Sequence, residues 1–141
     1  MDRPIGIFDS GVGGLTELHE VMSRLPFEDL IYFGDTARVP YGIKSAETVT
    51  RYSVEIADFL LAKKIKMLIV ACNTASSVAL PDLAARCDIP VIGVLVPGAK
   101  AAVKYSAVRK IGVIGTEATI GSSAYVKAIH GIDAGVEVYT K

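Results

Sequence analysis

The segment Met67-Leu68-Ile69-Val70-Ala71-Cys72-Asn73-Thr74 decides the fold of this chain of 141 residues. Its first part, from Met67 to Ala71, is apolar at every position, so a strand there would bury side chains on both faces. Strands of that kind belong to parallel sheets that helices cover on each side. The next stretch, from Ala75 to Arg86, is expected to be helical, which leaves three polar or reactive residues (72–74) where the strand ends.

On both sides of this segment, short apolar runs alternate with amphipathic stretches along the chain. We expect further strands at 5–8, 30–33, 90–94, 111–114 and 136–139, and further helices at 15–25, 46–63, 98–105 and 122–129. Ser45 is the expected N-cap of the longest helix. Strand and helix alternating in this way predict an α/β fold: a mainly parallel sheet with helices on both faces. We expect a first domain over 1–96 and part of a second over 97–141, because about 45 residues are fewer than a domain usually has.

The composition argues against several classes of protein. Half of the residues are hydrophobic (51%) and the formal net charge is +0, so we expect neither a disordered chain nor a nucleic-acid or membrane partner. No apolar run reaches the roughly 20 residues that span a bilayer, and the first residues do not form a signal peptide. The two cysteines do not suggest a disulfide framework. We therefore expect a cytoplasmic protein with reduced thiols.

Polar residues follow the first expected strand, at the sheet edge where parallel α/β proteins bind ligands. The glycines of Asp9-Ser10-Gly11-Val12-Gly13-Gly14 would let the backbone approach a ligand, and the following helix offers free N–H groups to a carboxylate or phosphate. Thr16 stands where a dinucleotide fingerprint needs its third glycine. A tight turn capped by Asp9 or Ser10, without a ligand, explains the same residues equally well.

The loop over 34–42 is long for a strand-to-helix connection. Asp35 and Thr36 are expected to make turn hydrogen bonds, whereas Tyr41 and Gly42 have no evident structural reason for their place.

Cys72 is the candidate reactive residue of the chain. It follows the most apolar strand and precedes a helix, whose positive end favours the thiolate. A buried cysteine in isolation is more often inert, but Asn73 and Thr74 beside it favour a functional role. His19 and His130 lie away from the strand ends, which argues against a cysteine hydrolase. Cys87 is expected at the opposite edge of the sheet, since a dozen helical residues rise about 18 Å.

Five segments, taken together and in this order, resemble the glutamate racemases of the aspartate/glutamate racemase family along essentially the whole chain. They are Phe8-Asp9-Ser10-Gly11-Val12-Gly13-Gly14-Leu15, residues 32–42, Ala71-Cys72-Asn73-Thr74-Ala75, residues 89–94 with 97–99, and Ile111-Gly112-Val113-Ile114-Gly115-Thr116. The resemblance implies two α/β domains with glutamate bound between them, and interconversion of L- and D-glutamate by two thiols, with no cofactor and no metal, for peptidoglycan synthesis. It implies that Cys72 and Asp9 are catalytic, and that the substrate contacts are Asp9, Ser10, Tyr41, Gly42, Asn73 and Thr74, joined from the second domain by Thr116 and Thr119.

One departure from the family limits what this chain is expected to do. The family's second cysteine belongs to a Cys-Thr-His motif, and these 141 residues contain no such motif. We therefore expect a truncated second domain, no racemisation by the chain alone, and self-association or homodimer formation through uncovered apolar surface. Two alternatives stay open. One is a module that binds an acidic ligand without chemistry, and the other is a phosphoryl-transfer site in which Asp9 and Asp35 together bind magnesium.

Overall fold

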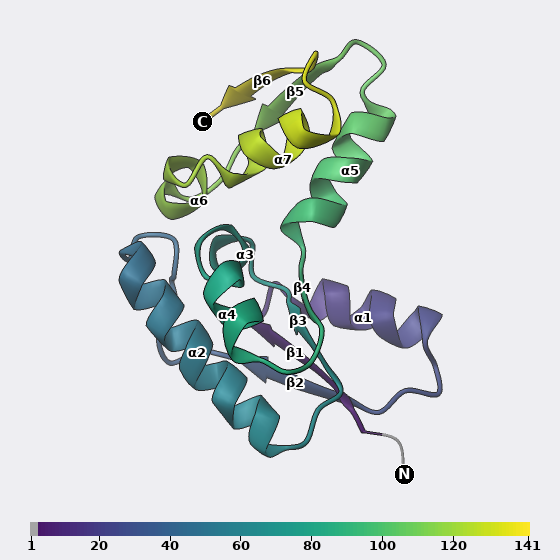
Figure 1. The fold of residues 1–141 in the computed structure, drawn as a ribbon, viewed down its shortest axis with the longest axis vertical. Helices are drawn as coiled ribbons and strands as arrows, with labels where there is room; N and C mark the ends of the chain where they lie inside the picture. Colours follow the sequence, from purple (N-terminus) through teal and green to yellow (C-terminus); the bar gives the residue numbers. More distant parts are fainter. Residues whose placement is uncertain (1–2) are drawn as a thin grey trace.

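The computed structural model describes residues 3–141, which form two parallel sheets (Figure 1). The larger sheet has the strand order β2-β1-β3-β4. Its strands are β1 (Ile5–Asp9), β2 (Leu30–Gly34), β3 (Met67–Val70) and β4 (Val91–Gly93). The smaller sheet pairs β5 (Lys110–Val113) with β6 (Glu137–Thr140). The predicted α/β fold with a mainly parallel sheet is confirmed.

Helices cover both faces of the larger sheet. The helix α1 (Leu15–Arg24) lies on one face, where Leu18 and Val21 pack against Ile5 and Ile7. The other face packs against α2 (Ala46–Ala62), α3 (Asn73–Val78) and α4 (Leu80–Arg86), and Figure 1 shows α1 opposite α2 and α4. The strands of this sheet are therefore buried from two sides, as the apolar run in β3 predicts.

The smaller sheet has its own core. The helices α5 (Leu95–Tyr105) and α7 (Ala124–Ile132) pack on it, and the short helix α6 (Glu117–Gly121) follows β5. Ala99, Ile111, Ile129 and Val136 form the buried centre of this part. The predicted boundary between residues 96 and 97 falls inside the first turn of α5, and the division into 1–96 and 97–141 stays a prediction.

The predicted N-cap of the longest helix is confirmed, because Ser45 Oγ accepts a hydrogen bond from the Thr48 N–H at 3.2 Å. The single helix expected over 75–86 is wrong. The structure has two helices that meet at Ala79, since Pro81 has no N–H to continue the ladder and is tolerated only in a first turn. The expected start of the next helix at Gly98 is also wrong, because α5 begins at Leu95 and holds Pro97 in its first turn.

The helix expected over 122–129 differs from the structure as well. The backbone of Ser123 is left-handed (φ 54°), and this conformation separates α6 from α7. The helix α6 was not expected from the sequence, although Thr116 is a favourable N-cap and its side chain accepts from the Thr119 N–H.

The strand order fixes where a ligand can bind. From β1 the chain goes to β2 on one side, and β3 then lies on the other side of β1. Sheets of this kind open a crevice where the order reverses, outside the carboxyl ends of the two central strands. The segments that follow β1 and β3 are 10–14 and 71–74, which contain the glycine turn and Cys72. No helix among residues 3–141 is long and apolar enough to cross a membrane.

Candidate active site

The glycine turn after β1 is organised by its own carboxylate. Asp9 is buried, and its Oδ2 accepts hydrogen bonds from the N–H groups of Gly11 at 3.0 Å and Gly14 at 3.2 Å. From β2, the Tyr32 hydroxyl donates to the Gly11 carbonyl at 3.2 Å. Burial, and next the charge of Asp9, raise the pKa of Tyr32 to about 12. The turn is therefore tied to two neighbouring strands of the sheet.

The thiol of Cys72 lies against this turn. Cys72 is the N-cap of α3, and its Sγ accepts from the Ala75 N–H at 3.4 Å. The thiol donates to Ser10 Oγ, also at 3.4 Å. Although the residue is only 4% exposed, its sulfur meets polar groups from two elements rather than an aliphatic surface alone.

A cavity of about 540 Å³ opens at this point, a size typical of small-molecule sites. Its walls come from the glycine turn, the start of α1, Val39 and the segment after β3. Glu17 adds a carboxylate to that of Asp9, and no lysine or arginine is among the lining residues. The cavity therefore offers carboxylates to a cation, but only hydroxyl, amide and backbone N–H groups to an anion.

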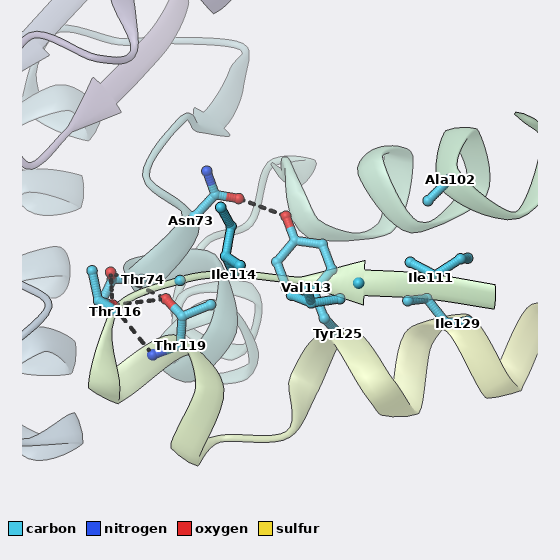
Figure 2. A pocket seen from close by; sticks show the side chains of 12 residues that line it. Asn73, Thr74, Ala102, Ile111, Val113, Ile114, Thr116, Thr119, Tyr125 and Ile129 are labelled. Carbon is cyan, nitrogen blue, oxygen red and sulfur yellow. Dashed lines mark hydrogen bonds between the residues drawn. The ribbon is translucent and has the colours of Figure 1, made fainter. Parts of the chain in front are cut away.

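Asn73 and Thr74, beside the sulfur, are held by residues of α6, its N-cap and α7. The Tyr125 hydroxyl donates to Asn73 Oδ1 at 2.6 Å (Figure 2). Thr74 Oγ1 lies 3.1 Å from Thr116 Oγ1 and 3.3 Å from Thr119 Oγ1, and these last two oxygens are 3.0 Å apart. We call these three residues the threonine cluster. A second cavity, of about 490 Å³, lies on their other side and is lined by β5 and the helices around it.

Of the residues named from the sequence, the structure brings Asp9, Ser10, Cys72, Asn73 and Thr74 to one cavity. Tyr41 and Gly42 are not among its lining residues. Tyr41 is 1% exposed, and its hydroxyl donates to Asp35, which also accepts from Arg38 Nε at 2.7 Å. Burial, together with the hydrogen bond to Asp35, raises the pKa of Tyr41 well above its ordinary value.

Gly42 lies at the contact between the two parts of the chain. Its carbonyl accepts from the Ala118 N–H at 3.1 Å, and an added Cβ would stand 2.3 Å from Thr116 Cβ. A residue without a side chain is therefore needed here for the threonine cluster to approach the loop after β2.

The magnesium alternative loses its basis in this geometry. Asp9 faces the N–H groups of its own turn, whereas the Asp35 carboxylate faces the Tyr41 hydroxyl and the Arg38 guanidinium. Two carboxylates occupied in this way by different donors do not form a shared metal site. Within 3–141, no group of three His, Cys, Asp or Glu side chains is placed to hold a metal ion.

The remaining candidates lie elsewhere. Cys87 ends α4 ahead of β4, at the edge of the sheet opposite Cys72, as expected, and burial raises the pKa of its thiol. His19 and His130 are exposed on α1 and α7. Two residues beside the site were missed by sequence analysis: Glu17, which lines the cavity, and Tyr125, which reaches Asn73 from a helix 52 residues further on. No local pattern around Tyr125 signals this contact.

The structure thus defines a parallel α/β protein with a glycine turn and a thiol where its strand order reverses. The sequence profile of the family described as Asp/Glu/Hydantoin racemase matches residues 11–141, and the chain belongs to this family. Its curated relatives include the glutamate racemase of Geobacter metallireducens, 62% identical over 139 residues (99% of this chain, 52% of the relative). That of Oceanobacillus iheyensis is 56% identical over 98% of this chain and 50% of the relative.

Solved structures agree with this placement. Glutamate racemase isoform RacE1 from Bacillus anthracis matches with a TM-score of 0.95 and 47% identity, over 98% of this chain and 52% of the other. Glutamate racemase from Francisella tularensis, solved in complex with D-glutamate, matches with a TM-score of 0.91 and 45% identity, over 99% of this chain and 52% of the other. The chain thus spans about half the length of the relatives it matches.

Proposed function

We propose that this chain provides one half of a glutamate racemase site, in which Cys72 exchanges the α-proton on one face of the substrate without a cofactor. The observation that carries the proposal is the contact between the Cys72 sulfur and Ser10 of the glycine turn, at the wall of the cavity of about 540 Å³. Its relatives are named glutamate racemases, and one of them was solved with D-glutamate bound.

The lining of the cavity suits an amino acid with two carboxylates. Asp9 Oδ1 accepts from no described residue, so it is available to the substrate's ammonium group, while Oδ2 holds the turn. Ser10, Asn73, Thr74 and the N–H groups at the start of α1 are neutral donors for the carboxylates. We further propose that Tyr41 and Gly42 contribute contacts from the loop after β2, as the family resemblance implies.

The proposed step is a proton transfer between carbon and sulfur. The Cys72 thiolate forms an S–H bond as the C–H bond at the α-carbon breaks, and the electron pair moves into the adjacent carboxylate. Asp9 assists by holding the ammonium group beside the reacting carbon. Return of the proton by the same thiol restores the original enantiomer.

Racemisation needs a second acid on the opposite face of the α-carbon. Of the two cysteines in the sequence, Cys87 lies at the other edge of the sheet, so the described residues offer one thiol to the cavity. We therefore propose that the 141-residue chain exchanges the α-proton of one enantiomer with retention of configuration and does not racemise glutamate alone. In a whole racemase, the D-glutamate formed would serve peptidoglycan synthesis.

The test is incubation of the chain with L- or D-glutamate in D₂O. Proton NMR reports loss of the α-hydrogen, and polarimetry reports inversion. We expect deuterium to enter one enantiomer without loss of optical rotation. Cys72→Ser should abolish this exchange, and Cys87→Ser should leave it unchanged. Conversion of both enantiomers to the racemate would show that a second thiol is not required.

The same experiment decides between catalysis and binding alone. Glutamate binding, measured by isothermal titration calorimetry, should survive in Cys72→Ser under either function. Binding without α-proton exchange in the wild-type chain would favour a module that holds an acidic ligand and does no chemistry.

We also propose that the chain associates with a second copy of itself in the cytoplasm. Within residues 3–141, β4 is an edge strand that pairs with β3 alone, and Ile92 on it is 42% exposed. A groove of about 420 Å³ runs beside it, lined by Ile92, Ile69 and Val21 among others. An unpaired apolar edge is a template for pairing with another strand. The cytoplasm is proposed because it keeps the thiol of Cys72 reduced.

A further inference from the structure

The side chain of Asn73 is oriented by a residue from the other part of the molecule. Tyr125, at the start of α7, donates its hydroxyl proton to Asn73 Oδ1 at 2.6 Å. Figure 2 shows the carbonyl oxygen of Asn73 turned toward the tyrosine and its amide nitrogen pointing away. Asn73 itself lines both cavities, so its amide lies between them.

We infer that Tyr125 is a positioning residue for substrate binding, which acts through Asn73 and presents the amide nitrogen to a substrate carboxylate. The inference rests on the proposed function, and it adds a residue that sequence analysis did not select. Tyr125 is absent from the lining of the cavity beside Cys72, so its effect on the substrate there is exerted through Asn73.

An amide side chain has one accepting end and one donating end, which rotation about its last bond exchanges. In the structure the accepting end is occupied by Tyr125, so the donating end remains for a ligand. This choice matters because the cavity wall contains no lysine or arginine, and an anion must be held by neutral donors. With the amide reversed, its carbonyl oxygen would face a carboxylate and repel it.

The surroundings of Tyr125 allow it to serve as a fixed donor. Burial, and next the charge of Glu17, raise the pKa of Tyr125 above its ordinary value, so the hydroxyl keeps its proton throughout the neutral range. The neighbouring residue, Thr74, is held independently by Thr116 and Thr119. The backbone that carries Asn73 is therefore fixed as well, and the tyrosine has only the amide to orient.

The test compares the wild-type chain with Tyr125→Phe, which keeps the ring and removes the hydroxyl. Tyr139→Phe is the matched control, because the Tyr139 hydroxyl meets only the exposed carboxylate of Glu137. One readout needs no ligand: the NMR resonances of the Asn73 side-chain amide. The other is the Kd for L- and D-glutamate from isothermal titration calorimetry, repeated in an Asn73→Ala background.

We expect the Asn73 amide resonances to shift in Tyr125→Phe and to stay in place in Tyr139→Phe. The Kd for glutamate should rise about tenfold in Tyr125→Phe, the scale of one hydrogen bond to a charged group. In the Asn73→Ala background the same substitution should change the Kd less than twofold, because its partner is gone.

Unmoved Asn73 resonances in Tyr125→Phe would overturn the inference, and so would an unchanged Kd or additive losses in the double variant. Absence of glutamate binding by the wild-type chain would instead overturn the proposed function, and the substrate role of Tyr125 with it. The amide resonances distinguish these failures, because they report the contact between Tyr125 and Asn73 whether or not glutamate binds.

Discussion

The sulfur of Cys72 lies 3.4 Å from Ser10 Oγ, although 62 residues separate the two in the sequence. They meet because β1 and β3 are neighbouring parallel strands, with Phe8 paired to Val70. The two strands therefore end at the same edge of the sheet. The contact joins the reactive thiol to the loop that shapes the ligand cavity. Several consequences of this arrangement can be measured.

Removing the hydroxyl of Ser10 should slow the chemistry without unfolding the protein. In Ser10→Ala the Cys72 thiol loses its acceptor and is less well oriented toward the α-carbon, so we expect α-proton exchange to slow about tenfold. The measurement is deuterium incorporation into glutamate by NMR. Ser23→Ala is the control, because Ser23 Oγ only donates to the His19 carbonyl on the exposed side of α1. Equal rates in wild type and Ser10→Ala would contradict the role given to this contact.

A methyl group at Gly34, at the end of β2, should displace the glycine turn after β1. An added Cβ would stand 2.3 Å from the Gly11 carbonyl oxygen, a backbone atom that cannot rotate away. We expect Gly34→Ala to lower the free energy of unfolding by roughly 1–3 kcal/mol and to weaken glutamate binding. Urea unfolding measures the first effect. In contrast, Gly131→Ala in α7 meets nothing within 4 Å and should be neutral or stabilising.

Tyr41→Phe separates a supporting role from direct contact with the substrate. The substitution removes one of the donors to the buried Asp35 and should lower the free energy of unfolding by roughly 1–3 kcal/mol. Tyr105→Phe, at a position 78% exposed, should have no measurable effect. Unchanged stability in Tyr41→Phe would mean that water replaces the hydroxyl. The Kd for glutamate, measured well below the unfolding transition, shows whether Tyr41 also contacts the substrate. Weaker binding in Tyr41→Phe supports the contact between Tyr41 and glutamate that the family resemblance implies.

Alkaline conditions should reveal the burial of Tyr32. Its pKa is raised to about 12 in the folded chain from an ordinary value of 10.0, so between these values the unfolded chain loses the proton while the folded chain keeps it. This contribution to stability is complete below pH 10 and is lost as the pH rises to 12. The free energy of unfolding of Tyr32→Phe should therefore fall less steeply than that of wild type above pH 10. Parallel curves in urea titrations across this range would contradict the prediction.

The proposed association of two copies can be tested at the edge strand. In sedimentation velocity experiments, we expect the mean size of the wild-type chain to grow with concentration. A charge on β4 should oppose pairing, so Ile92→Lys should shift the distribution toward the monomer. Val108→Lys is the control, because Val108 is 74% exposed between α5 and β5, away from that edge. A wild-type chain that stays monomeric at every concentration would exclude this mode of association.

The sequence was sufficient for features that depend on nearby residues. The apolar run at 67–71 predicts β3 and its burial, and Ser45 predicts where α2 begins. The meeting of the Asp9 turn with Cys72 also followed, because parallel strands have their carboxyl ends at one edge.

Contacts between distant segments could not be predicted in this way. Whether Tyr41 points to a ligand or to Asp35 depends on how the loop after β2 packs. The tyrosine on α7 reaches Asn73 only because α6 and α7 pack against α3. The break at Ala79 is different, because Pro81 was visible in the sequence and its missing N–H should have divided the helix expected there.

The threonine cluster has a property that charged groups would not give it. In each of its three hydrogen bonds either oxygen can be the donor, so the direction of the protons can reverse while every heavy atom stays in place. Thr74 has one hydroxyl proton, so with all three bonds intact it offers a lone pair to an ammonium group. It offers its proton to a carboxylate when Thr116 and Thr119 both donate to it and the bond between those two is lost. A rigid wall of this kind can change its polarity to suit whichever end of an amino acid it meets.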